Sequence, residues 1–238
     1  MENASILVVD DDHDIVNAIA MLLEKEGYHI LRAYNGIEAI DTIISNDVQL
    51  IIIDVMMPKL DGLSAMMRIR DKKNIPIIVL SAKSEDSDKI LGLSMGADDY
   101  ITKPFSISEL IARVDAVCRR VDMSYSKPEE VTSITSGPFT LNLKSRIVYK
   151  NDVPLELTQV EYQIMEYFLK NQNTALDRNT ILNHIWGDGY YGDDKIVDVN
   201  IRRIRMKIED EPSNPKYLLT IWGFGYKWTS GQKNGQNK

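Results

Sequence analysis

The chain has 238 residues, a formal net charge of −7 and one cysteine, Cys118. A single thiol excludes an internal disulfide and suits the reducing cytoplasm. Because the sequence contains neither a signal peptide nor an apolar run long enough to span a bilayer, export and membrane insertion are not expected. The length exceeds that of one typical domain, so we expect a cytoplasmic protein of two domains with no membrane partner.

The first half of the chain alternates short apolar runs with helical patterns. Largely β-branched runs occupy residues 6–9, 50–53 and 75–80, and such runs are typical of strands buried on both faces of a parallel sheet. Apolar residues at helical spacing follow at 16–23, 37–43 and 63–69. Strands that alternate with helices indicate βαβ units and therefore an α/β fold with a doubly wound parallel sheet.

Polar residues stand at the ends of the predicted strands. Asp10 and Asp11 follow the first run, Asp54 the second and Ser81 the third, and Lys103 follows a short strand at residues 100–101. In an open sheet of this kind the carboxyl ends of the strands meet at the ligand site, so we expect these residues to converge. Each also has a simpler interpretation, because aspartate is a common N-cap and lysine and serine are common at surfaces.

Three carboxylates at one place repel one another. At about 4 Å and an effective dielectric of about 20, each like pair costs about 4 kcal/mol, so the group requires a cation or protonation. Mg²⁺ is favoured, because it takes carboxylate oxygens and works beside phosphoryl groups. The pattern therefore predicts Asp54 as a carboxylate nucleophile whose phosphoryl group is neutralised by the metal, Lys103 and the Ser81 hydroxyl.

The two halves of the chain differ in charge. Residues 1–125 carry 13 basic and 21 acidic side chains, a net charge of −8, and residues 126–238 carry 15 and 14, a net charge of +1. Between the halves, residues 122–136 are polar and without periodicity, which is typical of a linker. The acidic balance of the whole chain does not exclude nucleic acid, because binding needs only a local basic face.

That basic face lies on one predicted helix. Residues 195–207 hold five basic side chains and one acid, and their apolar members recur at helical spacing. A basic amphipathic helix is either a solvated surface helix, a membrane-surface helix or a helix laid in the major groove. Membrane binding is disfavoured, because the apolar stripe lacks tryptophan, phenylalanine and leucine.

The elements around the basic helix complete a small domain. A capping box at Thr158 opens a helix at 158–170, and Asp177 can cap a second helix to residue 186. Strands are predicted at 139–143 and 146–149, and a hairpin with a glycine-bearing turn at 218–228. Three helices and a terminal hairpin describe an α+β winged helix-turn-helix domain.

Four motifs of the first half resemble the receiver domain of bacterial response regulators. They are VVDDD at residues 8–12, DVMMPKLDG at 54–62, VLSA at 79–82 and GADDYITKPF at 96–105. The resemblance implies a receiver domain at 1–121 with a flavodoxin-like, doubly wound, five-stranded parallel sheet.

The receiver resemblance also implies roles for individual residues. A sensor histidine kinase would phosphorylate Asp54. The Mg²⁺ would be held by Asp11, Asp54 and the Met56 backbone carbonyl, with Asp10 helping through water. Lys103 would bind the phosphoryl group, Ser81 would move toward it, and Tyr100 would change rotamer. Phosphohydrolases of the haloacid dehalogenase type are the enzymatic alternative, but they place a second aspartate, the general acid, two residues after the nucleophile. Met56 occupies that position and cannot donate a proton, so we expect no enzyme beyond slow self-hydrolysis of the aspartyl phosphate.

Four motifs of the second half resemble the effector domain of the OmpR/PhoB family. They are LTQVEY at 157–162, IWG at 185–187, VDVNIRRIR at 197–205 and TIWGFGY at 220–226. The resemblance implies a linker at 122–134, a winged helix-turn-helix DNA-binding domain at 135–230 and a disordered tail at 231–238. Residues 214–217 and 220–223 and the receiver also resemble the vancomycin-resistance regulator branch, which implies a role in glycopeptide or cell-envelope resistance.

The effector resemblance implies contacts with promoter DNA and with RNA polymerase. The groove would receive Val199, Asn200, Arg202 and Arg203, and phosphates would meet Lys195, Arg205 and Lys207. Trp222 stands where many members carry a wing arginine, so no strong minor-groove contact is predicted there. The loop at 187–194, with Tyr190 and Tyr191, corresponds to the polymerase-contacting loop of the family, and an ordinary solvent loop is the alternative.

Dimerisation on phosphorylation follows from charge pairs that bridge two receivers in this family. The matching residues are Lys89 with Glu109 and Asp99 with Arg113, and Asp98 with Arg120 is a further candidate pair. Exposed pairs contribute only about 0 to 1 kcal/mol each, and one further family pair is absent here, so we expect a weak dimer or one held by apolar contacts. The sequence thus predicts a phosphorylation-controlled transcription factor. The alternative is a receiver protein whose second half contacts only proteins.

Overall fold

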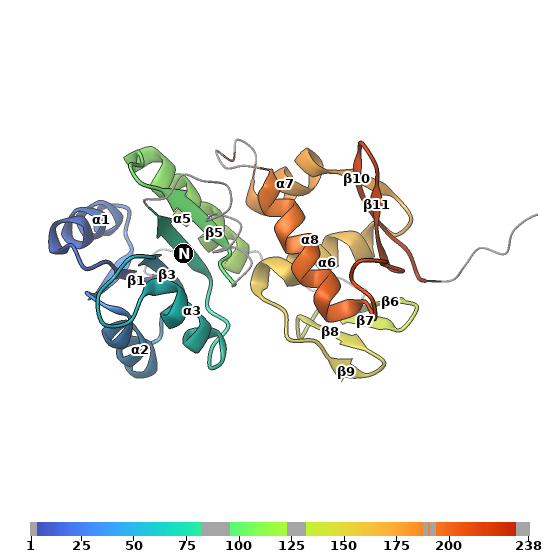
Figure 1. Ribbon diagram of the computed structural model, residues 1–238, viewed down its shortest axis with the longest axis horizontal. Helices are drawn as coiled ribbons and strands as arrows, with labels where there is room; N and C mark the ends of the chain where they lie inside the picture. Colours follow the sequence, from blue (N-terminus) through green and yellow to red (C-terminus); the bar gives the residue numbers. More distant parts are fainter. Residues whose placement is uncertain (1–3, 82–95, 123–131, 188–189, 191–193, 232–238) are drawn as a thin grey trace, which may run out of the picture. The chain divides into compact units, whose positions relative to one another are not determined.

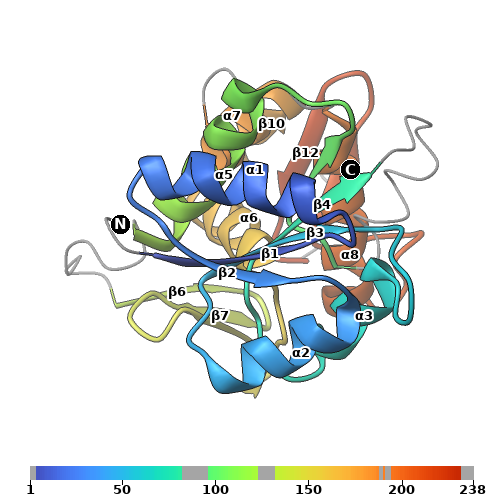
Figure 2. The ribbon, with the colours of Figure 1, turned by 90° about the vertical axis from the view of Figure 1, so that its left-hand side faces the viewer.

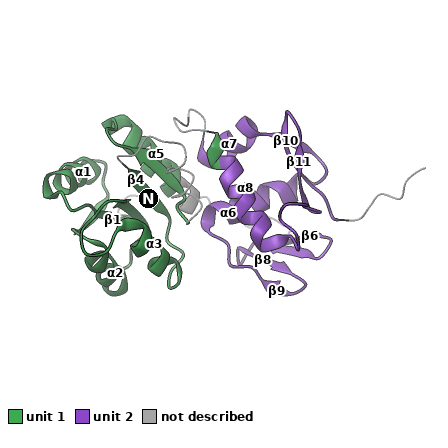
Figure 3. Ribbon diagram, in the orientation of Figure 1, with its two compact units in different colours: residues 1–125, 189–196 green, residues 126–188, 197–238 purple. Residues whose placement is uncertain are grey.

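The computed structural model describes residues 4–81, 96–122, 132–187, 190 and 194–231. The chain divides into two compact units (Figure 3), and each is described by itself. Unit 1 comprises residues 1–125 and 189–196, and unit 2 comprises residues 126–188 and 197–238. No helix in these described ranges is both long and apolar enough to cross a membrane.

Unit 1 is built on a parallel sheet with strand order β2-β1-β3-β4-β5. The strands are β1 (Ser5–Val9), β2 (His29–Ala33), β3 (Leu50–Asp54), β4 (Ile77–Ser81) and β5 (Asp99–Thr102). The helices are α1 (His13–Lys25), α2 (Gly36–Ser45), α3 (Gly62–Arg70) and α5 (Ile107–Asp122). Figure 2 shows α1 on one face of the sheet and α2 and α3 on the other. The predicted doubly wound receiver fold is confirmed.

The core of unit 1 joins the sheet to α1 and α5. Strand residues of β1, β3, β4 and β5 form one buried apolar cluster with Val16, Leu23, Leu110 and Val114 of the two helices. Cys118 belongs to the same cluster and is 6% exposed, so its thiol packs in the core. This continuous apolar layer fixes where each strand ends, and therefore where the polar residues after the strands lie.

Local signals set the limits of several elements in unit 1. The carboxylate of Asp12 accepts from the backbone N–H groups of Asp14 and Ile15, so it is the N-cap of α1. The predicted strand at 75–80 begins two residues late, at Ile77, because Pro76 has no N–H to donate to a neighbouring strand. The sequence pattern did not predict strand β2, because residues 29–33 do not form a continuous apolar run. The strand lies at the sheet edge, where its side chains are only partly buried.

The described part of unit 2 contains three helices and two antiparallel sheets. One sheet holds β6 (Ser133–Ser136), β7 (Phe139–Asn142), β8 (Ile147–Lys150) and β9 (Val153–Pro154); the other, in the order β10-β12-β11, holds β10 (Ala175–Asp177), β11 (Leu218–Ile221) and β12 (Gly225–Trp228). The helices are α6 (Gln159–Lys170), α7 (Arg178–Trp186) and α8 (Lys195–Ile208). Figure 1 labels these elements. The predicted winged-helix fold is confirmed.

The caps of unit 2 follow the sequence closely. Thr158 and Glu161 form the expected capping box of α6, and Asp177 caps α7. Strand β6 was not expected, because its residues belong to a polar stretch that resembles a linker; the backbone pairing of Ser133–Ser136 with β7 gives it its strand structure. Most of the predicted linker and tail, at 123–131 and 232–238, lies outside the described residues.

Candidate functional site

The predicted acidic site lies at the carboxyl edge of the parallel sheet in unit 1. Asp10 directly follows β1, Asp54 is the last residue of β3, and Ser81 is the last residue of β4. Lys103 directly follows β5, and its backbone N–H donates to the Ser81 carbonyl at 2.7 Å. Because these four strands are adjacent and parallel, they bring together residues that are far apart in the sequence.

Lys103 bridges two buried acids at this edge. Its Nζ lies 2.6 Å from Oδ2 of Asp10 and 2.6 Å from Oδ1 of Asp54. Asp10 is 1% exposed and Asp54 is 5% exposed. The second oxygen of each acid accepts a backbone N–H, from Asp12 at 3.0 Å and from Met56 at 2.6 Å, respectively. The two carboxylates therefore share one cation, and each is further neutralised by a backbone dipole.

Burial and charge shift the acid–base properties of this group. Burial raises the pKa of the Asp54 carboxyl above its ordinary 3.8, although the hydrogen bond from Lys103 acts in the opposite direction. Burial by itself would lower the pKa of the Lys103 ammonium, but its hydrogen bonds to Asp10 and Asp54 outweigh that effect and raise it. Lys103 therefore stays protonated beside Asp54, and its role as a phosphoryl-binding group stays a prediction.

The raised pKa of Asp54 predicts a stabilising substitution. Ionising the Asp54 carboxyl is less favourable in the folded than in the unfolded protein, so ionised Asp54 lowers the free energy of unfolding. This loss of stability is absent at pH values below the pKa of Asp54 in the unfolded chain. It grows as pH rises through the pKa of Asp54 in the folded protein and is complete above that pKa. Asp54→Asn should therefore raise the stability of unit 1 at neutral pH, by an amount that shrinks in mild acid. Urea unfolding followed by circular dichroism measures it.

Asp61→Asn is the control of opposite sign for this stability measurement. Hydrogen bonds from the Ser64 hydroxyl and backbone N–H lower the pKa of the Asp61 carboxyl, so its ionised form stabilises the fold above the unfolded pKa. The asparagine variant should be less stable than wild type at neutral pH, with the difference disappearing in acid. Equal stabilities of Asp54→Asn and wild type at every pH would contradict the account of Asp54.

The donor atoms at the sheet edge suit a hard divalent cation. Asp10, Asp54 and the exposed Asp11 offer only carboxylate oxygens, the ligand type that Mg²⁺ prefers. Within the described ranges no three acids are gathered into a metal-ligand group, and Lys103 supplies the positive charge between Asp10 and Asp54. The side chain of Met56 is 64% exposed beside this group. The chemistry fits the predicted Mg²⁺, and the assignment of individual ligands stays a prediction.

The predicted switch residues lie on the neighbouring strands. Ser81 is partly buried at the end of β4, and Tyr100 on β5 is 5% exposed. Their strands are hydrogen-bonded neighbours, with Val79 opposite Tyr100 and Ser81 opposite Thr102. Because Asp54 lies opposite Leu80 and Leu80 lies opposite Ile101, Ser81 and Tyr100 are each one residue from the level of Asp54 in the sheet. Their movement on phosphorylation stays a prediction.

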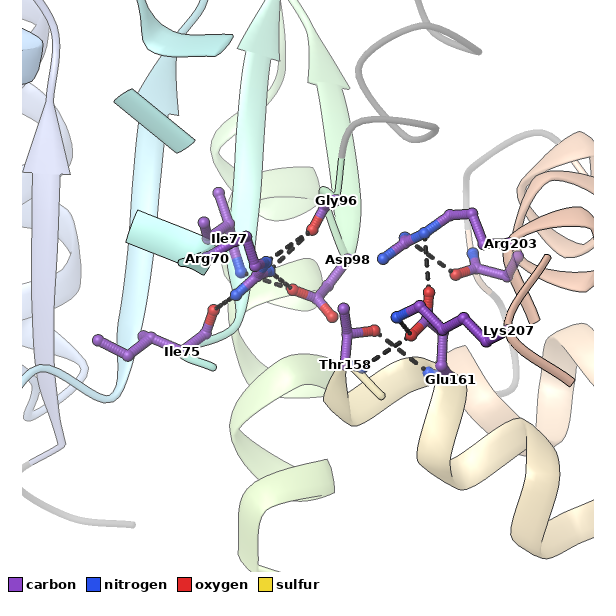
Figure 4. A network of polar contacts seen from close by, with 10 residues as sticks. Arg70, Ile75, Ile77, Gly96, Asp98, Thr158, Glu161, Arg203 and Lys207 are labelled. Atoms are coloured by element: carbon purple, nitrogen blue, oxygen red, sulfur yellow. Dashed lines mark hydrogen bonds and ion pairs between the residues drawn. The ribbon is translucent and has the colours of Figure 1, made fainter. Parts of the chain in front are cut away.

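The predicted dimer residues are engaged within one receiver. The Arg113 side chain is 4% exposed. Its Nη1 lies 2.9 Å from Oδ1 of Asp99 and its Nη2 lies 2.8 Å from Oε1 of Glu109. Asp98 is 1% exposed and accepts from Nη2 of Arg70 at 2.5 Å and from the Ile77 backbone at 2.8 Å (Figure 4). Arg70 was not expected as its partner, because no sequence pattern links the end of α3 to β5.

The remaining dimer residues are not fully described. Lys89, together with the segment 82–95, lies outside the described residues, as does the side chain of Arg120. An intermolecular role for Asp98 with Arg120 would require Asp98 to leave Arg70, and one for Arg113 would require a change in its pairs with Asp99 and Glu109. The dimer interface stays a prediction.

The seven predicted DNA-binding residues of α8 differ in accessibility. Lys195, Arg202 and Lys207 are exposed, whereas Val199, Asn200 and Arg203 are 7%, 0% and 9% exposed in the full chain; Arg205 is intermediate. Base contacts by the three buried residues stay a prediction, and they require that these side chains become accessible. Lys195, Arg202 and Lys207 are the predicted contacts that this structure already presents to solvent.

Two predicted DNA-binding cations are paired with Glu161, which the sequence identified only as a capping residue. Glu161 is 0% exposed; its Oε1 lies 2.9 Å from Nε of Arg203 and its Oε2 lies 2.6 Å from Nζ of Lys207 (Figure 4). Oε2 also accepts the Thr158 backbone N–H at 2.8 Å. The capping glutamate of α6 therefore fixes the inner side of α8 as well.

One of the two predicted polymerase-loop tyrosines is described. Tyr190 is grouped with unit 1, where its hydroxyl donates to Oδ1 of Asp99 at 2.6 Å and its ring centroid lies 4.7 Å from Cζ of Arg113. Burial raises the pKa of the Tyr190 hydroxyl, so it remains a hydrogen-bond donor. Tyr191 lies outside the described residues. A polymerase contact by Tyr190 stays a prediction, and it would have to replace the bond to Asp99.

Comparison with known proteins matches both units to families. A family model described as the response regulator receiver domain matches residues 6–115, and one described as "Transcriptional regulatory protein, C terminal" matches residues 152–228. The uncharacterized transcriptional regulatory protein YcbL of Bacillus subtilis (strain 168) is 41% identical over 223 residues, which cover 93% of this chain and 98% of the relative.

Solved structures agree with these matches. The structure of DrrB, described as a Thermotoga maritima OmpR/PhoB homologue, is 28% identical, with a TM-score of 0.51, and the match covers 95% of this chain and 99% of that one. The structure of a RitR mutant, at 23% identity, has a TM-score of 0.76 over 95% of this chain and 99% of its own, which supports the fold.

A receiver joined to a C-terminal DNA-binding unit defines a response regulator, which is a transcription factor rather than an enzyme. The chain belongs to the OmpR/PhoB family of response regulators.

Proposed function

We propose that Asp54 accepts a phosphoryl group from a sensor histidine kinase and thereby controls binding of the chain to promoter DNA. The observation that carries this proposal is the pair of contacts made by Asp54 at the end of β3. Its Oδ1 is held 2.6 Å from the Lys103 ammonium and its Oδ2 receives the Met56 N–H at 2.6 Å. A buried carboxylate oriented by two donors is a nucleophile prepared for one defined reaction.

In the proposed transfer, a carboxylate oxygen of Asp54 attacks the phosphorus of a phosphohistidine. The P–N bond breaks, its electron pair stays on the imidazole, and an aspartyl phosphate remains on β3. Lys103 lies where it neutralises the new charge, and the Ser81 hydroxyl, one strand away, supplies a further donor. Mg²⁺, bound through Asp11 and Asp54 and the Met56 carbonyl with Asp10 assisting, would supply additional positive charge for the transferring group.

The proposed output is binding of double-stranded promoter DNA as a homodimer in the cytoplasm. Phosphorylation would favour pairing of two receivers through Lys89, Asp98, Asp99, Glu109, Arg113 and Arg120, and α8 would enter the major groove. Tyr190 and Tyr191 would then meet RNA polymerase. We further propose genes of glycopeptide or cell-envelope resistance as the regulon, on the resemblance of residues 214–217 and 220–223 to the vancomycin-resistance regulator branch.

The test is treatment with acetyl phosphate and Mg²⁺, read by intact mass and by footprinting on the upstream region of the chain's own gene. Wild type should gain one hydroxylamine-labile phosphoryl group and a stronger footprint, and chelation of the metal should prevent both. Asp54→Ala should gain neither, whereas the matched variant Asp61→Ala, which alters an exposed acid, should gain both. Equal phosphorylation of Asp54→Ala, or none of wild type, would disprove the mechanism.

A further inference from the structure

The turn between β2 and α2 contacts the loop that follows Asp54. Gly36 is the first residue of α2, and its backbone N–H donates to the Leu60 carbonyl at 3.2 Å. Leu60 belongs to residues 55–61, which join β3 to α3 and which we call the acceptor loop. Figure 2 shows α2 and α3 on the same face of the sheet. The bond from Gly36 therefore joins two turns that belong to different βαβ units.

The contact leaves no room for a side chain at Gly36. A Cβ at this position would lie 2.7 Å from the Leu60 carbonyl oxygen and 2.8 Å from Cβ of Ala65, which is fully buried on α3. Both distances are shorter than ordinary van der Waals contact, and neither atom lies at the end of a flexible side chain. The φ of Gly36 is not positive, so glycine is required here by space rather than by backbone conformation. A larger residue has to separate α2 from the acceptor loop.

The start of α2 is held by its own cap. The buried Asn35 side chain accepts the N–H groups of Ile37 and Glu38, each at 3.1 Å. The Glu38 carboxylate accepts from the Asn35 amide at 2.7 Å and from the Tyr34 N–H at 2.9 Å. Because these bonds fix the first turn of the helix, the Gly36 N–H keeps a constant direction toward the acceptor loop.

The acceptor loop is tied at its other end to the Asp54 carboxylate. The Met56 N–H donates to Oδ2 of Asp54 at 2.6 Å. Farther along the loop, the Leu60 N–H donates to the Pro58 carbonyl at 2.8 Å, and Lys59 between them has a φ of 67°. A residue other than glycine with such a φ is strained and persists only where its surroundings hold it. The bond from α2 is one such hold, because it fixes the carbonyl of Leu60 at the end of this turn.

Resting on the proposed phosphorylation of Asp54, we infer that Gly36 is a positioning residue for that reaction. Gly36 acts through the acceptor loop. Its bond to Leu60 keeps the loop in place, and the loop keeps the Met56 N–H on Oδ2 of Asp54. The nucleophile is thereby held in one orientation, and a displacement of about 1 Å at a reacting group can cost a factor of about 10² in rate. Separation of α2 from the loop should therefore slow phosphoryl transfer in a protein that remains folded.

A pair of glycine variants tests this role in the full-length protein. Gly36→Ala should lower the rate of phosphorylation by acetyl phosphate at saturating Mg²⁺ by about tenfold or more. Gly27→Ala is the matched control. Gly27 also lies in unit 1 and has a φ of 87°, so alanine strains the backbone there, but its Cβ would meet nothing within 4 Å. Both variants should lose stability in urea, and the control should keep the wild-type rate. Intact mass measures the rate, and circular dichroism establishes that each variant is folded.

Binding of Mg²⁺ without a phosphoryl donor gives a second readout. Asp54 directly precedes the acceptor loop, Met56 lies in it, and both are proposed metal ligands. Titration calorimetry should therefore show Mg²⁺ binding weakened several-fold in Gly36→Ala and unchanged in Gly27→Ala. Loss of stability alone would leave the Mg²⁺ affinity of the folded protein unaltered, so this readout separates positioning from a purely structural role. Ala65→Gly in the Gly36→Ala background removes one of the two overlaps and should restore part of both the rate and the affinity.

The outcomes separate this inference from the proposed function. If wild type gains no phosphoryl group, or Asp54→Ala gains it equally, both fall. If wild type is phosphorylated on Asp54, and folded Gly36→Ala matches Gly27→Ala in rate and in Mg²⁺ affinity, the proposed function stands and the inference is overturned.

Hydrogen exchange on the wild-type protein decides the matter where Gly36→Ala does not fold. Because the Gly36 N–H is bonded to the acceptor loop, occupancy of the site by Mg²⁺ and beryllofluoride, a phosphoryl mimic, should slow exchange of that amide several-fold. The Gly27 N–H, which donates to the Glu24 carbonyl at 3.1 Å after α1, should exchange at an unchanged rate. Equal exchange of the Gly36 amide with and without the two ligands would overturn the inference.

Discussion

Glu161→Gln is expected to lower the free energy of unfolding of unit 2 by about 3–5 kcal/mol, the usual cost of removing one partner from a buried ion pair. The amide retains the oxygen that accepts the Thr158 N–H, so the capping bond of α6 is preserved and only the charge is lost. Arg203, 9% exposed, then keeps its charge but loses the Glu161 carboxylate that neutralises it. Lys207 is 35% exposed at its side chain and can return to water. The cost therefore comes chiefly from Arg203.

Urea unfolding followed by tryptophan emission measures this loss. All three tryptophans lie in unit 2, so tryptophan emission reports the unfolding of that unit and not that of the receiver. Glu166→Gln is the matched control, because Glu166 lies on the same helix and pairs with Lys170 in a partly exposed i,i+4 bridge. It should cost less than about 1 kcal/mol.

A double substitution tests the physical reason for the loss. Replacing Arg203 with methionine in the Glu161→Gln background removes the buried positive charge and should restore much of the stability, so the two substitutions should not be additive. A Glu161→Gln loss no larger than that of Glu166→Gln would show that the pair with Arg203 contributes little.

Gly62→Ala is expected to destabilise unit 1 by at least about 3 kcal/mol, a cost reached only by severe steric or burial defects. A Cβ at position 62 would lie 1.9 Å from the Asp54 carbonyl oxygen and 2.9 Å from its carbonyl carbon. Both atoms belong to the backbone, so no side chain can move aside. The Gly62 N–H also donates to the Val55 carbonyl at 3.0 Å, which holds the start of α3 against the end of β3.

The Gly62 substitution should affect chemistry as well as stability. Relief of the overlap has to move the backbone of Asp54, so the variant should accept a phosphoryl group from acetyl phosphate more slowly even where it remains folded. Circular dichroism measures the unfolding, and intact mass measures the phosphorylation. Met67→Ala, which truncates a side chain of α3 that is 45% exposed, should leave both nearly unchanged. Wild-type stability of Gly62→Ala would disprove the close approach.

Much of the fold was predictable because its signals are local. The apolar runs at β1, β3 and β4, the capping box of Thr158 and Glu161 and the Asp177 cap each depend on a few neighbouring residues. Edge strand β2 and strand β6 were missed for the converse reason. Their side chains are only partly buried, and backbone hydrogen bonds to distant strands give them their structure.

The candidate site divides in the same way. Acids at the ends of apolar runs predicted a charge cluster at the sheet edge, since parallel strands end together. Lys103 contacts both Asp10 and Asp54, and Lys103 and Asp10 are 93 positions apart in the sequence. No local sequence pattern predicts that these two acids share one lysine. The capture of Asp98 by Arg70 is likewise a contact between separate elements.

By itself, then, the sequence determined the doubly wound α/β half, the strand-end acids and the basic helix, because periodicity, capping and charge act over a few residues. The response-regulator class came from the resemblance of its motifs to that family. Only the tertiary structure decided which charges neutralise one another and which side chains meet solvent. Glu161 holds Arg203 and Lys207, Arg205 holds strand β11, and Trp222 is exposed in the turn after it. Those outcomes depend on desolvation and distance between elements, which are properties of the packed chain.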